Sequence, residues 1–323
     1  MTTQALPAAP VLGRPSWPVV RRGLLLVLVA SASLYGVVHL VGGFGAATRG
    51  LTSVQPWWVV AAVVAGSASY PAAALSQLGS VAGRVPLHRL VAAQVASAFT
   101  NRLLPVGAGG MATNVRCMRR SGMETGTAGT AVATTAVAGI VVHVLTLIAV
   151  VPVLLTVPAV RHAVAGSGIA VAATVAVVLV VAAVLVRPPA PVRRLLARVH
   201  AERAHLGATL RHPGRVALLL GGSLGVTVAH AAAFVAALHA VGAAAPLLLV
   251  VAVYVGAVTA AGLIPAPGGA GGLDVTLLAG LSAAGLSSAS AVTAVLLFRL
   301  LTFWLPTIPG AITMVVMLRR RLL

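Results

Sequence analysis

Long apolar runs separated by short polar segments make up most of this chain. A helix needs about 20 apolar residues to cross a membrane, and runs of that order recur from end to end. They cover residues 21–41, 57–78, 125–158, 165–186, 216–241, 246–264 and 290–317. The pattern therefore predicts an all-α fold, a polytopic bundle of transmembrane helices.

The first apolar run resembles a signal peptide at its edges, because Arg21-Arg22 precedes it and Ala30-Ser31-Ala32 could be cleaved. Its length is that of a full span, which favours an uncleaved first helix. The Pro- and Ala-rich residues 1–20 before it are predicted to be a disordered cytoplasmic tail.

The arginines predict the orientation of the spans. Arginine clusters tend to lie on the cytoplasmic side, and here they are at residues 14–22, 84–89, 116–120, 187–215 and 319–321. For all of them to share one side, the weaker apolar segment 87–104 must enter the membrane and return. An even number of crossings must also separate Arg215 from Arg319, so residues 265–286 are expected to complete a crossing as a broken helix. This gives about eight crossings with both termini cytoplasmic.

Two glycine-rich segments interrupt the apolar pattern. PVGAGGM at 105–111 and PGGAGGL at 267–273 share five of seven residues at an offset of 162 residues. Proline and glycine cannot continue a helix there, and opened backbone survives at membrane depth only inside protein or beside water. Paired breaks in corresponding halves indicate an internal repeat with re-entrant or broken helices, and they are typical of a transporter site.

The domain organisation follows from these segments. We expect one transmembrane domain over residues 21–318, with halves at about 21–186 and 216–318. The basic loop 187–215 joins the halves and could hold an amphipathic surface helix, and residues 319–323 are expected to be a basic C-terminal tail.

Composition narrows the classes of function. Of 323 residues, 59% are hydrophobic and 8% charged, and the mean hydropathy is +1.06, outside the range of soluble domains. All 22 basic residues are arginine, against three acidic residues. Because most of the chain lies in the bilayer, anionic lipid is the expected partner and nucleic acid is not. The single cysteine, Cys117, has no ligand cluster around it, so neither a metal nor a cofactor is expected. No nucleophile–base pattern or phosphate loop is present, so no enzyme activity is expected.

Charged residues inside the apolar runs are the candidate site. Arg299 lies too deep in the run 291–308 to reach the surface easily, which costs about 2.5–3.5 kcal/mol unless a partner compensates it. Asp274 is the candidate partner. Two interpretations stay open: a fixed ion pair that only holds the broken segment to the last helix, or a headgroup-binding Arg299 with Asp274 as a switchable partner.

The first glycine segment has its own basic neighbours, Arg102 and Arg116. A helix that restarts after glycines presents free N–H groups to an anion, and arginine holds phosphate with two parallel hydrogen bonds. The sequence therefore predicts a site for a lipid phosphate. Its candidate residues are Arg102, Gly109, Gly110, Arg116, Pro267, Gly268, Gly269, Gly271, Asp274 and Arg299.

LIPAPGGAGGLD, followed by AVLLFRLLTFWLPTIPG, resembles the signature of the lysylphosphatidylglycerol synthase transmembrane-region family. The matched residues of this second motif are Pro267, Gly268, Gly269, Gly271, Asp274 and Arg299, and those of the weaker first motif are Gly109, Gly110 and Arg116. Asp274 stands where the family pattern usually has glutamate, and Asn114 to Arg116 lack the usual acidic residue before the arginine. The resemblance covers roughly residues 20–318.

The resemblance implies a flippase-like integral membrane protein that moves an anionic phospholipid or a polyprenyl-linked lipid across the cytoplasmic membrane. The soluble aminoacyl-transferase domain of some members is not in this sequence, so lipid synthesis by this chain alone is not expected. A non-transporting scaffold or accessory subunit is the alternative, docking a glycosyltransferase or lipid synthase through residues 187–215. An intramembrane lipid-modifying enzyme is a third reading, and self-association stays open.

Overall fold

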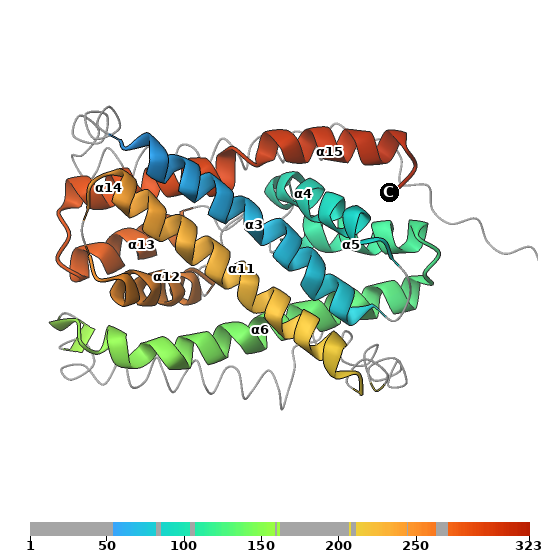
Figure 1. Ribbon diagram of the computed structural model, residues 1–323, viewed down its shortest axis with the longest axis horizontal. Helices are drawn as coiled ribbons and strands as arrows, with labels where there is room; N and C mark the ends of the chain where they lie inside the picture. Colours follow the sequence, from blue (N-terminus) through green and yellow to red (C-terminus); the bar gives the residue numbers. More distant parts are fainter. Residues whose placement is uncertain are drawn as a thin grey trace, which may run out of the picture.

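The computed structural model describes residues 54–81, 85–103, 107–158, 160–161, 207, 211–243, 245–262 and 271–323. Every regular element in these ranges is helical (Figure 1). The elements are α3 (Pro56–Ser80), α4 (Leu87–Leu103), α5 (Ala108–Arg120), α6 (Thr125–Leu154), α11 (Pro213–Ala240), α12 (Leu247–Gly262), α13 (Gly272–Ala283), α14 (Ser288–Arg299), the π-helical η3 (Leu300–Trp304) and α15 (Thr307–Arg319). The predicted all-helical membrane bundle is confirmed.

Four helical segments of the described part are long and apolar enough to cross a membrane. They are α3, α6, α11 and the continuous run Ser288–Arg319, close to the predicted spans. The chain is thus a multi-pass membrane protein. The predicted tail 1–20, the runs 21–41 and 165–186, and most of the loop 187–215 lie outside the described residues.

Helices α4 and α5 form an antiparallel hairpin. The Thr100 hydroxyl lies 3.1 Å from that of Thr113, the Asn114 amide donates to the Ser97 hydroxyl at 3.2 Å, and the Cys117 thiol lies 3.7 Å from the Arg89 carbonyl. Residue numbers therefore rise along one helix as they fall along the other. The arginine pattern predicts that the segment 87–104 enters and returns by itself, but residues 87–103 form one helix, and the chain returns toward the starting side through α5.

Helices α12 and α13 form a second antiparallel hairpin. Thr276 donates to the Ala257 carbonyl at 3.0 Å, and Gly280 lies against Val253. The crossings at 246–264 and 265–286 stay predictions, because two crossing helices would also be antiparallel, but the lengths of the helices favour a re-entrant hairpin. With 16 and 12 residues, these helices reach only about 24 and 18 Å at 1.5 Å per residue, less than the thickness of the hydrocarbon core.

The two halves of the described chain repeat the same order of helices. A long span, two short hairpin helices and another long span are formed by α3 to α6 and again by α11 to α15. Corresponding elements start 157 to 164 residues apart, at Pro56 and Pro213, Leu87 and Leu247, Ala108 and Gly272, and Thr125 and Ser288. This spacing agrees with the 162-residue offset between the glycine motifs, and the internal repeat is therefore structural.

The second repeat is inverted relative to the first. Gln55, just before α3, donates to Ala240 at the end of α11, whereas Gly79 near the end of α3 lies against Arg215 near the start of α11. These equivalent helices are thus antiparallel, as are α6 and α14–α15 in Figure 1, and the two hairpins lie toward opposite ends of the bundle. Inverted repeats of this kind are a common transporter architecture.

Close contacts between the repeats form the core. A Cβ on Gly222 of α11 would collide with the Ser76 backbone of α3, and the Ser76 and Ser223 hydroxyls hydrogen-bond at 2.9 Å. Each hairpin also packs on the last span of the other repeat. Gly310 of α15 fits against the α4 backbone, and His143 of α6 hydrogen-bonds Thr259 of α12 at 2.9 Å.

The arginines outside the bundle centre gather at one end. The first hairpin opens there with Arg89 and Arg120, α11 starts there after Arg211, and α15 finishes there with Arg319. Among the described residues, Arg161 lies at the opposite end, beyond α6. Over the described residues, one end of the bundle is thus strongly basic and the opposite end carries much less charge.

Candidate functional site

The second hairpin places an acidic side chain at the start of α13. Gly271 has a φ of 86°, which an L side chain rarely adopts, and this lets the chain turn directly into the helix. The Asp274 carboxylate, three residues on, accepts from the Gly271 N–H at 3.0 Å. It therefore caps the positive end of the helix with a negative charge of the protein itself.

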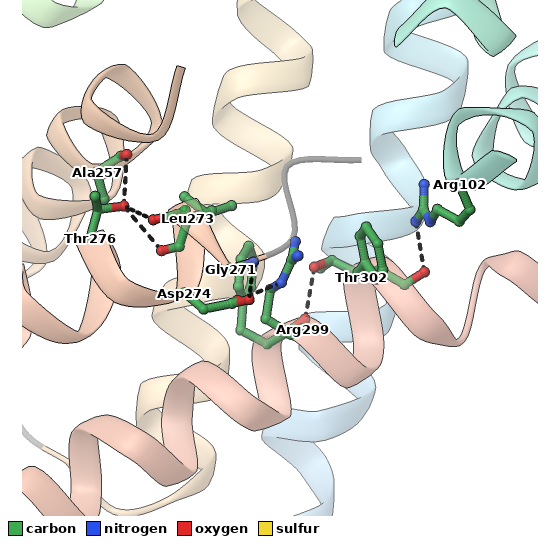
Figure 2. A network of polar contacts seen from close by, with 11 residues as sticks. Arg102, Ala257, Gly271, Leu273, Asp274, Thr276, Arg299 and Thr302 are labelled. Carbon is green, nitrogen blue, oxygen red and sulfur yellow. Dashed lines mark hydrogen bonds and ion pairs between the residues drawn. The ribbon is translucent and has the colours of Figure 1, made fainter. Parts of the chain in front are cut away.

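Asp274 also pairs with Arg299. The Arg299 Nε lies 2.7 Å from the Asp274 Oδ1, and the side chains are only 7% and 3% exposed (Figure 2). The expected partner of Arg299 is therefore the observed one. A buried charge without a partner is strongly destabilising, so separating Asp274 from Arg299 would be costly. The pair therefore holds α13 of the second hairpin against α14 of the last span.

The last span changes its winding directly after Arg299. Residues Leu300–Trp304 are π-helical, and the Leu305 N–H donates to the Leu300 carbonyl at 2.8 Å. Pro306 follows and has no N–H to continue the ladder. The break falls midway along the 32-residue segment Ser288–Arg319, a position near the centre of a bilayer.

The tip of the first hairpin meets this break. Arg102, in the last turn of α4, donates from Nη2 to the Phe303 carbonyl at 2.7 Å. Its guanidinium lies 3.9 Å from the centroid of the Phe303 ring, and the Arg299 guanidinium lies 4.2 Å from the same centroid. Figure 2 shows Arg102 and Arg299 reaching this region from different elements. The structure thus brings both arginines to one aromatic ring.

The charges at this site do not balance within the described part of the chain. Two guanidinium groups, Arg102 and Arg299, face one carboxylate, Asp274, and that carboxylate is bonded to Arg299 and to the start of α13. The Nε of Arg102 is buried and has no hydrogen-bond partner among the described residues. A buried cationic donor without an acceptor is costly, so the site is chemically suited to an anion.

The first glycine segment positions Arg102. A Cβ on Gly109 would overlap the Thr100 carbonyl, so only glycine allows α5 to start this close to α4. The Gly110 N–H donates to the Asn101 side chain at 2.6 Å. Gly109 and Gly110 therefore hold the hairpin tip together, and the Gly110 N–H is taken up by Asn101 and is not open to a ligand.

The remaining predicted residues lie elsewhere. Arg116 is half-buried in the last turns of α5 and has no hydrogen bond or ion pair within the described ranges. No contact joins it to Arg299, whereas Arg102 and Arg299 share Phe303. Pro267, Gly268 and Gly269 lie outside the described residues.

Phe303 is a central residue of the site that the charge pattern did not single out. The sequence feature that could have indicated it is the FRLLTFW motif, which places Phe303 one helical turn after Arg299. Tyr70 of α3 and His230 of α11 are electrostatic neighbours of Arg102. The Nδ1 of His230 lies 3.0 Å from the Val226 carbonyl. One polar side chain from each repeat therefore lies within electrostatic range of Arg102.

Comparison with known proteins identifies the family. The family model described as the lysylphosphatidylglycerol synthase TM region matches residues 23–310. A search of curated proteins finds no match. Across the described residues, no group of three His, Cys, Asp or Glu side chains could hold a metal ion.

Proposed function

The chain belongs to the lysylphosphatidylglycerol synthase transmembrane-region family, and from that premise we propose that it moves an anionic phospholipid or polyprenyl-linked lipid between membrane leaflets. In this proposal the lipid crosses the membrane without being chemically modified by the chain. The basic end of the bundle faces the cytoplasm, in keeping with the positive-inside tendency.

The unpaired Arg102 at mid-depth carries this proposal. Asp274 neutralises Arg299 and caps α13, so the charge that remains for a ligand is that of Arg102. A phosphate oxygen can accept from its free Nε and, by replacing the Phe303 carbonyl, from its Nη2 as well. That two-pronged hydrogen bonding is the geometry arginine offers to phosphate.

The inverted repeat supplies a path for movement. Each hairpin packs on the last span of the other repeat, and the two hairpins enter from opposite ends. Rocking of one repeat against the other would open the mid-depth site first to one side and then to the other, as in other transporters with inverted repeats. The acyl chains would stay in the bilayer while the headgroup passes Arg102.

Lipid translocation in vesicles tests the proposal. The full chain is reconstituted with a fluorescent phosphatidylglycerol, and a membrane-impermeant quencher reports how fast inner-leaflet lipid reaches the outer leaflet. Wild type should move the lipid faster than empty vesicles. Arg102→Gln should lower that rate by at least tenfold, since a lost charge-assisted contact is worth about 1.5–3 kcal/mol.

Arg161→Gln is the matched control, because it removes an exposed arginine at the opposite end of the bundle. It should keep the wild-type rate. The proposal fails if the wild type is no faster than empty vesicles, which is the result expected for a non-transporting scaffold or accessory subunit.

A further inference from the structure

The last residues of the chain fold back onto the first hairpin. The Arg321 N–H donates to the Leu318 carbonyl at 3.1 Å and the Leu322 N–H to the Met317 carbonyl at 2.9 Å, with Arg321 at a positive φ of 55°. Leu323 is 2% exposed. Residues 319–323, expected to be a basic tail, are therefore an ordered turn, because Leu322 and Leu323 find an apolar surface to cover.

That apolar surface belongs to the hairpin. Leu323 and Met317 share one buried cluster with Cys117 of α5 and with Ala93 and Ala96 of α4. The turn after α15 is thereby fixed beside the end of α5, where Arg119 and Arg120 lie (Figure 1). Segments 200 residues apart in the sequence meet at this end of the bundle.

Five exposed arginines result from this arrangement, and we call them the arginine platform. They are Arg119, Arg120, Arg319, Arg320 and Arg321. None of them forms an ion pair or a hydrogen bond through its side chain in the described part of the chain. Five unpaired positive charges held in one place attract anions strongly.

The platform lies at the level of lipid headgroups. On α15, Ile312, Val315, Val316 and Leu318 are exposed apolar side chains, as on a surface that faces acyl chains, and the arginines begin at the next residue. Basic clusters directly beyond a membrane span bind anionic headgroups. This position favours a lipid over a water-soluble acidic protein.

We propose that the arginine platform is a second binding site, which collects anionic lipid headgroups at the membrane surface next to the first hairpin. Helix α4 runs from this end of the bundle to Arg102 at its other end. If the proposed translocation is correct, the platform raises the local concentration of its substrate. Binding at the platform itself does not depend on translocation.

Lipid association at the protein surface tests the platform. The full chain is placed in phosphatidylcholine bilayers with a trace of spin-labelled phosphatidylglycerol or phosphatidylcholine, and the protein-bound fraction is measured. Wild type should prefer the anionic label, and molar salt should reduce that preference. Replacing the five arginines by glutamine should lower the preference by at least about threefold, given the attraction each basic residue contributes near a charged surface.

Two further variants separate an ordered platform from charge alone. Leu323→Ala keeps all five arginines but loosens the turn. It should lower the preference for the anionic lipid by less than the variant in which all five arginines are replaced. Arg161→Gln, at the other end, should leave the preference unchanged. The platform is refuted if the variant without the five arginines keeps the wild-type preference for anionic lipid, or if Arg161→Gln lowers that preference by the same factor. A normal preference without any translocation would refute the proposed function and leave the platform intact.

Discussion

At the scale of single residues, buried Arg299 and half-buried Arg102 are in different situations. Arg299 has a carboxylate 2.7 Å away, whereas Arg102 has a backbone carbonyl and an aromatic ring. A full ion pair compensates a buried guanidinium far better than a carbonyl dipole and a ring face do. Arg299 is therefore neutralised by the protein, whereas Arg102 still has a hydrogen-bond donor and a charge that a ligand can use.

The sequence predicts the first of these situations and not the second. The cost of burying Arg299 demands a partner, and the chain has only three acidic residues, which pointed to Asp274. Nothing local indicates that Arg102 would reach Phe303, 201 residues away, because that contact depends on how the hairpin tip meets a change in helix winding. Arg116, on the other side of the same glycine segment, looked equally suitable.

The Asp274–Arg299 pair makes a prediction about stability. Asp274→Asn should destabilise the protein by about 3–5 kcal/mol, because it leaves Arg299 charged, buried and without a carboxylate. Asp274→Leu combined with Arg299→Met should recover most of that loss, since no charge remains to be desolvated. Thermal unfolding of the purified variants in detergent measures both.

Two outcomes would count against this account of the pair. One is an Asp274→Asn variant as stable as wild type, which would mean that Arg299 is solvated. The other is a double variant less stable than Asp274→Asn. Translocation by the stable double variant would then show whether the pair is only structural.

At the scale of elements, glycines decide which helices lie close together. Gly79 and Gly222 let α3 and α11 approach until one backbone nearly touches the other, and Gly109 does the same for α4 and α5. Small residues play this part widely in membrane helices. The sequence predicted Gly109 and Gly110 to be part of a helix break, but both lie within α5 and act as contact points, and the pattern did not single out Gly79 or Gly222.

Neighbouring glycines of α11 provide a matched test. Gly222→Ala should destabilise the protein by about 1–3 kcal/mol, because the new methyl group collides with the Ser76 backbone. Gly221→Ala should be neutral or stabilising by up to about 1 kcal/mol, since its Cβ meets nothing within 4 Å and alanine favours the helix. Unfolding midpoints in the same detergent compare them. Equal effects of the two changes would contradict the close helix crossing.

At the scale of the whole molecule, the bundle is an inverted repeat with one hairpin from each end. The similarity of the two glycine segments predicted the repeat and its spacing, because α5 and α13 each start after a glycine with positive φ, Gly107 and Gly271. The number of crossings was not predictable in the same way. Helix α12 is as apolar as a true span and packs against α6, α11 and α13, and apolar composition does not say whether a helix crosses or returns.

Chemical labelling tests this topology. In a Cys117→Ser background, Leu247→Cys and Ser288→Cys flank the second hairpin, and Ser121→Cys lies at the basic end. A membrane-impermeant thiol reagent added to intact cells should label positions 247 and 288 and spare 121. Two crossings would also leave positions 247 and 288 on one side, so Gly262→Cys near the hairpin tip decides the question. In inside-out vesicles it should resist the reagent while position 121 reacts, and labelling at 262 as complete as at 121 would mean that α12 and α13 each cross the membrane.

The most direct test of the central claim compares headgroups at Arg102. Translocation of fluorescent phosphatidylglycerol and of its phosphatidylcholine analogue is measured in the same vesicles for wild type, Arg102→Lys and Arg102→Gln. The account predicts that wild type moves the anionic lipid faster than the zwitterionic one, that Arg102→Lys keeps part of this preference, and that Arg102→Gln loses it. Equal rates for both lipids in wild type, or an unchanged preference in Arg102→Gln, would contradict the assignment of the mid-depth arginine to an anionic headgroup.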